Sequence, residues 1–198
     1  MALSVAVAVG DEVADLLVQK LSESMKNLKF GAYTDSTNDF GPVITKQHQQ
    51  SVINHISSAE KQGANVVVDG RDAIVSGYEN GFYVGGTLID KVTPQMDSYK
   101  AEIFGPVLQI VRVETMKDAM SLIDDHEYGN GTCIFTRDGE AARYFSDHIK
   151  VGMVGVNIPL PVPVAYHSFG GWKRSLFGDL HAYGPDSIRF YTKRKTIT

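Results

Sequence analysis

The chain has 198 residues, of which 43% are hydrophobic and 21% are charged, so it can bury a sizeable core and does not have the composition of a disordered protein. Its formal net charge of −4 argues against a nucleic-acid or anionic-membrane partner, both of which need a basic face, and no apolar run approaches the roughly 20 residues that span a bilayer. A single cysteine excludes an internal disulfide and fits a reducing compartment, which predicts a cytoplasmic protein, or a mitochondrial-matrix protein in a eukaryote.

The first third of the chain predicts a strand followed by two helices. Residues 4–9 alternate β-branched residues with alanine, as a core strand does, and Asp11 can cap the helix that follows. Thr45 can cap a second helix, which ends at Gly63. Short extended segments are expected at 64–68 and 82–89. The first helix should lay its apolar stripe on a sheet; the stripe comprises Val13, Leu16, Leu17, Leu21, Met25 and Leu28.

The stretch 101–113, AEIFGPVLQIVRV, joins a carboxylate and an aromatic ring to an apolar strand. Glu102 and Phe104 precede a Gly-Pro turn, and residues 107–113 have the pattern of a strand covered on both faces. Polar and aromatic residues at the mouth of such a strand are candidate ligand contacts. The local pattern alone favours a structural interpretation, in which Glu102 is a solvated loop acid and Phe104 is part of the core.

A regular alternation follows this stretch. Thr115 and Asp118 form a helix-capping pair, residues 131–136 predict a strand, Asp138 begins a helix, and residues 151–158 predict another strand. Strands that alternate with helices indicate an α/β protein with a three-layer α/β/α arrangement and a mainly parallel sheet.

The last 40 residues break this rhythm. Prolines at every second position from Pro159 to Pro163 exclude a helix and a central strand, so an extended surface segment or a pocket wall is expected. Residues 187–198 alternate like an exposed strand, which can complete either a neighbouring subunit's sheet or the edge of its own.

The residues reveal no other catalytic or metal-binding pattern. The six histidines lack close metal-ligand spacing, with the exception of His48 and His55, which would stand two helical turns apart, and no dinucleotide-binding or phosphate-binding glycine motif is present. Cys133 lies within a predicted strand, where a thiol is normally inert. We therefore expect no metal ligand and no catalytic residue in this chain.

Four motifs, in this order and spacing, resemble the C-terminal half of the aldehyde dehydrogenase superfamily over the whole chain. Within the superfamily they are most similar to the NAD-dependent, coenzyme-A-acylating branch that oxidises methylmalonate semialdehyde. The motifs are EIFGPVLQIVRV, YGNGTCIFTRD, GMVGVNIPLPVPVAYHSFGGWKRSLFGDLHAYG and RFYTKRKTIT.

The resemblance implies a role for several residues. Glu102 matches the glutamate that holds the nicotinamide ribose, and Phe104 matches the ring that packs beside the nicotinamide of NAD. His48 and Ser51 fall where some relatives touch the ribose but differ from them in residue type. The segment from Pro161 to Phe169 is expected to line the semialdehyde pocket.

The resemblance also implies a domain organisation and a missing part. Residues 1–186 would belong to the catalytic domain, and residues 187–198 would form an oligomerisation strand of a homo-oligomer. The nucleophilic cysteine would lie directly before the position of Met1, and the cofactor domain would lie further upstream. We therefore expect a C-terminal fragment that is inactive without its N-terminal half; a non-catalytic interaction module of the same fold is the alternative.

Overall fold

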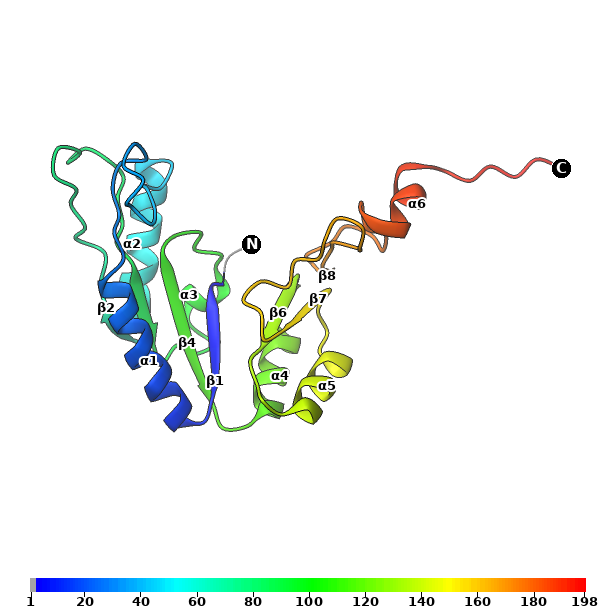
Figure 1. The fold of residues 1–198 in the computed structure, drawn as a ribbon, viewed down its shortest axis with the longest axis horizontal. Coiled ribbons are helices and arrows are strands. Elements are labelled where there is room, and N and C mark those ends of the chain that lie inside the picture. Colours follow the sequence, from blue (N-terminus) through cyan, green and yellow to red (C-terminus); the bar gives the residue numbers. More distant parts are fainter. Residues whose placement is uncertain (1–2) are drawn as a thin grey trace. The chain divides into compact units, whose positions relative to one another are not determined.

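The computed structural model describes residues 3–198 and shows an α/β protein in two compact units (Figure 1). The N-terminal unit spans residues 3–119, and the C-terminal unit spans residues 120–198. The elements from the start of the chain to the boundary are β1 (Val5–Val9), α1 (Asp11–Lys26), α2 (Lys46–Lys61), β2 (Asn65–Val68), β3 (Thr87–Asp90), α3 (Asp97–Lys100), β4 (Val107–Val113) and α4 (Met116–Asp125), within which the boundary falls. The remaining elements are β5 (Tyr128–Gly129), β6 (Gly131–Ile134), α5 (Gly139–His148), β7 (Met153–Val156), β8 (Trp172–Lys173), the 3₁₀ helix η1 (Gly184–Asp186) and α6 (Ser187–Tyr191).

The N-terminal unit is built on a four-stranded sheet with the order β1-β4-β3-β2. The strand β4 pairs in parallel with both β1 and β3, and β2 adds an antiparallel strand beside β3. The predicted mainly parallel sheet is confirmed. The apolar run of β4 therefore lies at the centre of the sheet, where its backbone is bonded on both sides.

Helices cover both faces of this sheet. Successive side chains of a strand point to opposite faces, so Leu108 and Ile110 of β4 face α1 and pack with its Ala14. Gln109 faces the other way and donates from Nε2 to the Ser98 carbonyl oxygen of α3, at 3.0 Å. The helix α2 contacts α3 and β2 on this second side. The result is the predicted three-layer α/β/α arrangement.

The buried face of α1 differs from the predicted stripe. Val13 and Leu16 are more than half exposed, while Ala14 is fully buried. The small Ala14 side chain lets the helix backbone approach the sheet closely, and this fixes which face turns inward. The residues that pack on the core beside it are Leu17, Val18, Leu21 and Met25.

Side-chain caps begin three of the helices where the sequence places them. Thr45 Oγ1 accepts the backbone N–H of His48, and Asp138 accepts two N–H groups of α5. Thr115 and Asp118 bond reciprocally at the start of α4. The prediction for Asp11 is wrong, because Gly10, with φ 87°, occupies the cap position and Asp11 is the first residue of α1.

The C-terminal unit contains a parallel pair, β6 and β7, connected through α5, and a short antiparallel pair, β5 and β8. Lys173 in β8 has its Nζ within 3.1 Å of the carbonyl oxygens of Ile123, Asp124 and His126. These carbonyls lie at and just beyond the C-terminus of α4, where a cation is favourable. Lys173 therefore has a structural role.

The end of the chain corrects the predicted terminal strand. The strand was expected from residue 187, but residues 187–191 form the short helix α6, directly after η1. The Pro185 ring restricts φ to helical values and favours this turn. Oligomerisation through residues 192–198 stays a prediction. None of the helices in residues 3–198 combines the length and hydropathy needed to cross a membrane.

Ion pairs hold the carboxyl ends of the parallel strands together. Asp90, at the end of β3, is 3% exposed and accepts two hydrogen bonds from Arg112 of β4, at 2.7 and 3.0 Å. The same guanidinium reaches Asp11 and Asp15 of α1, at 3.3 and 2.8 Å. These carboxylates raise the pKa of Arg112, chiefly through the hydrogen bonds that its guanidinium donates to Asp90. One side chain thus links two strands and a helix.

We predict that Arg112→Met destabilises the N-terminal unit by about 3 kcal/mol, because it leaves the Asp90 carboxylate buried without its cation. Urea unfolding followed by circular dichroism measures the change. The matched control is Asp15→Asn, which removes an exposed partner of the same guanidinium and should cost less than about 1 kcal/mol. Equal losses for the two variants would contradict this assignment.

Candidate functional site

The loop of residues 101–106 connects α3 to the central strand β4. It therefore lies at the amino end of β4, which is also the amino end of the parallel neighbours β1 and β3. Ligands of open α/β sheets usually bind at the carboxyl ends of the strands. The candidate site is at the opposite edge, so that general rule does not account for it.

Phe104 is the exposed tip of this loop. Phe104 is 79% exposed, which excludes the alternative that its ring is part of the core. Its φ of 57° places the backbone in the left-handed region, which is unusual for a residue other than glycine. Glu102, two residues earlier, is also exposed, and Ile103 between them is buried. Ile103 thus anchors the loop, and the residues before and after it, Glu102 and Phe104, are exposed to solvent.

Contacts with α2 hold the segment from α3 to this loop. At one end, Asp97 accepts from Gln62 Nε2 at 2.6 Å and donates its N–H to Gln62 Oε1 at 3.0 Å. At the other end, His48 Nε2 lies 2.9 Å from the Phe104 carbonyl oxygen. Gly105 packs directly on Val52 of the same helix. Residues 97–105 therefore run antiparallel to α2, from its last turn to its first.

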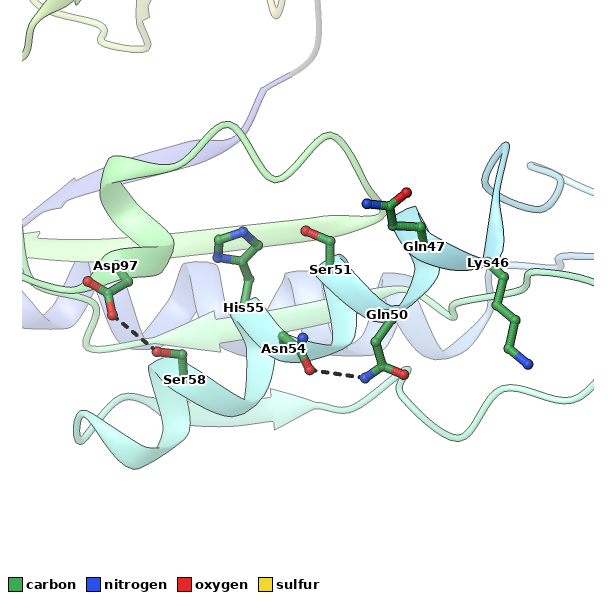
Figure 2. A pocket seen from close by; sticks show the side chains of 8 residues that line it. All are labelled: Lys46, Gln47, Gln50, Ser51, Asn54, His55, Ser58 and Asp97. Atoms are coloured by element: carbon green, nitrogen blue, oxygen red, sulfur yellow. Dashed lines mark hydrogen bonds between the residues drawn. The ribbon is translucent and has the colours of Figure 1, made fainter.

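A polar groove with a volume of about 710 Å³ follows this side of α2 (Figure 2). Figure 2 shows Asp97 reaching in from α3 toward Ser58, to which it is bonded at 3.4 Å. The groove is lined by Lys46, Gln47, Gln50, Ser51, Asn54, His55, Ser58 and Asp97. Its hydroxyl, amide and imidazole groups can donate and accept hydrogen bonds, so it suits a polar ligand with hydroxyl groups.

The sequence pointed to only part of this groove. Ser51 is among its lining residues, and His48 contacts the loop instead. The other polar residues were missed, although Gln47, Ser51, Asn54 and Ser58 recur at helical spacing. That polar stripe was a usable signal. The stripe did not lead to a predicted site because a polar helix face is normally just solvated.

The other predicted site residues belong to the C-terminal unit. Pro161 is buried, and Phe169 is 38% exposed with its ring edge-on to Tyr183, the two centroids 6.3 Å apart. Ser168 beside it is hydrogen-bonded to His181 Nδ1. Residues 158–167 form no helix or strand, as the prolines predicted. Their role in lining a substrate pocket stays a prediction.

Cys133 does not have the environment of an activated nucleophile. Burial raises the pKa of its thiol, which disfavours the reactive thiolate at neutral pH. Its sulfur lies against Gly155 of the neighbouring strand β7. Within the described part of the chain, no three or more histidine, cysteine or acidic side chains are grouped to hold a metal ion.

Comparison with known proteins gives one consistent family. The aldehyde dehydrogenase family profile matches residues 2–197. A malonate-semialdehyde dehydrogenase of Pseudomonas aeruginosa is 67% identical over 198 residues, which is 100% of this chain and 40% of the relative. The crystal structure of methylmalonate-semialdehyde dehydrogenase from Oceanimonas doudoroffii is 76% identical, with a TM-score of 0.95 over 98% of this chain and 40% of that one.

A second solved structure contains NAD. It is a putative methylmalonate-semialdehyde dehydrogenase from Sinorhizobium meliloti complexed with NAD, and it is 57% identical, with a TM-score of 0.95. The match covers 98% of this chain and 40% of that protein. The chain thus spans well under half the length of the relatives it matches.

We predict that Gly105→Ala displaces the 101–106 loop, because a Cβ there would lie 2.8 Å from Val52 Cγ2. The overpacking should cost about 1–3 kcal/mol, measured by urea unfolding. The test is a double-mutant cycle with Val52→Ala, which opens the space that the new methyl group needs. Gly105→Ala should cost clearly less in the Val52→Ala background; an unchanged cost would show that the loop does not rest on Val52.

Proposed function

The chain belongs to the aldehyde dehydrogenase family, and from this membership we propose that it is the C-terminal part of an NAD-dependent, coenzyme-A-acylating semialdehyde dehydrogenase. The complete protein would oxidise methylmalonate semialdehyde to an acyl-coenzyme-A thioester. The observation that carries the proposal is the 67% identity over the whole chain with a malonate-semialdehyde dehydrogenase. The runner-up within the family is another acylating enzyme with a different semialdehyde, and malonate semialdehyde is the first to test.

The residues of the candidate site fit NAD. An exposed phenyl ring at Phe104 offers a flat apolar face, and the Glu102 carboxylate offers acceptors for the two hydroxyl groups of a ribose. The polar groove beside them, lined among others by Gln47 and Ser51, adds further hydrogen-bonding groups. When bound, NAD supplies the acceptor for the hydride that leaves the aldehyde carbon.

The division of roles follows from what this chain contains. Glu102 would bind the nicotinamide ribose and orient the cofactor. The Phe104 ring would pack beside the nicotinamide and shield it from water. Pro161 and Phe169 would line the semialdehyde pocket. The cysteine that attacks the aldehyde and the dinucleotide-binding domain would come from the missing N-terminal half, and coenzyme A would take the acyl group.

A non-catalytic interaction module is the second candidate. It is favoured by the large apolar side chains that the C-terminal unit exposes, among them Phe177, which is fully exposed, and Ile188 and Tyr191, which are each over 70% exposed. Such side chains suit an interface. Exposed apolar side chains of this kind would also serve a homo-oligomer of the full-length enzyme.

We predict that the isolated chain forms no NADH from methylmalonate semialdehyde, NAD and coenzyme A. A chimera in which it replaces the matching 40% of the Pseudomonas aeruginosa relative should be active. NADH absorbance measures both, with malonate semialdehyde as the alternative substrate. Turnover by the isolated chain would refute the fragment proposal. A folded but inactive chimera, together with self-association of the chain in light scattering, would favour the interaction module.

In the same chimera, we expect Glu102→Gln to raise the KM for NAD about tenfold, since a hydrogen bond to a charged group contributes roughly 1.5–3 kcal/mol. The substitution keeps the size of the side chain and removes its charge. Glu114→Gln, at another exposed acid beyond β4, is the matched control. An unchanged KM for NAD in Glu102→Gln would argue against a cofactor contact.

A further inference from the structure

The backbone of Phe104 needs support that its ring does not provide. A left-handed conformation at a non-glycine residue costs on the order of 1–3 kcal/mol and persists only where the surroundings enforce it. The residue is 79% exposed, so burial of its ring does not supply that free energy. The restraint must come from the backbone and from the neighbours of the loop.

The residues on both sides of Phe104 are fixed. Ile103 is 6% exposed and anchors the preceding position. After it, Gly105 packs on Val52, and the Pro106 carbonyl oxygen accepts the N–H of Thr87 in β3 at 2.8 Å. Between these anchors, the orientation of the Phe104 carbonyl group determines the backbone conformation of the loop tip.

His48 holds that carbonyl group. A carbonyl oxygen can only accept, so His48 Nε2 carries the proton and donates it over 2.9 Å to the Phe104 oxygen. His48 is itself well placed, because its backbone N–H is bonded to Thr45 Oγ1 at the helix cap, at 3.1 Å. The next residue, Gln49, donates to the Tyr83 carbonyl oxygen at 2.7 Å. The first turn of α2 therefore restrains two loops through their carbonyl groups.

We propose that His48 is a positioning residue for the cofactor site, which acts by fixing Phe104 and not by touching the ribose. The Phe104 carbonyl oxygen already accepts the Nε2 proton of His48, so that nitrogen cannot also donate to a ribose hydroxyl. This role rests on the proposed function, since it needs NAD to lie against Phe104. This role differs from the direct ribose contact that some relatives make at the position of His48.

The test is a double-mutant cycle for NAD affinity, measured by titration calorimetry on the chimera described above. His48→Leu should weaken NAD binding about tenfold, which corresponds to 1.4 kcal/mol. His48→Gln, whose amide can still donate, should stay within about threefold of the parent. In the Phe104→Ala background, His48→Leu should change the affinity less than about twofold, because the ring through which it acts is gone.

The matched control is His148→Leu. His148 Nδ1 also bonds to a carbonyl oxygen, that of Tyr144, at 2.8 Å, but neither residue lines the groove or belongs to the Phe104 loop, so its loss should leave NAD affinity unchanged. If His48→Leu does not fold, His48→Asn replaces it, because its amide is too short to reach the carbonyl group. A second readout is amide hydrogen exchange of residues 101–107, which His48→Leu should accelerate and His48→Gln should not.

The outcomes separate the two proposals. A full loss of affinity from His48→Leu that persists in the Phe104→Ala background would mean direct contact with NAD and would overturn the positioning role. Equal losses for His48→Leu and His48→Gln, with unchanged hydrogen exchange, would overturn it as well. A folded parent chimera that binds no NAD would instead overturn the proposed function.

Discussion

The constraint on which the site depends is the path of residues 97–105 along α2. Beyond the single turn of α3 this segment has no regular structure, and its direction is set at its two ends, by Gln62 at the C-cap of α2 bonded to Asp97 and by His48 in the first turn of α2 beside Phe104. Because a helix is rigid over this length, the two attachments fix the separation between α3 and the loop tip. An exposed acid and an exposed ring can then be presented in a defined place without being packed themselves.

The sequence predicted the elements that are decided locally. The caps at Thr45, Thr115 and Asp138 lie where their hydrogen bonds form, because capping needs only neighbouring residues. The central strand could be predicted because seven consecutive residues of β4 satisfy one pattern. These features were enough to predict the α/β class, whereas the family resemblance came from the four longer motifs.

The features that the sequence did not predict depend on distant contacts. The bond between His48 and Phe104 joins residues 56 positions apart, so no local pattern announces it. The inward face of α1 was misjudged because apolar residues lie on more than one side, and the fit of Ala14 to the sheet decided the outcome. At the terminus, alternation over a few residues does not separate a strand from a single helical turn, and α6 follows the turn begun by η1.

The position of the site at the amino edge of the sheet has a physical explanation at the other edge. There, the ends of β3 and β4 and the start of α1 are joined by Asp90, Arg112, Asp11 and Asp15. A ligand at that edge would have to displace a bidentate ion pair whose acid is 3% exposed, and exposing or unpairing it costs several kcal/mol. The Gly10 N–H also closes onto the Val113 carbonyl oxygen, at 2.8 Å. The edge at which α/β sheets usually bind ligands is thus used for stability here, and the proposed cofactor site lies at the amino edge, where the Phe104 loop is exposed.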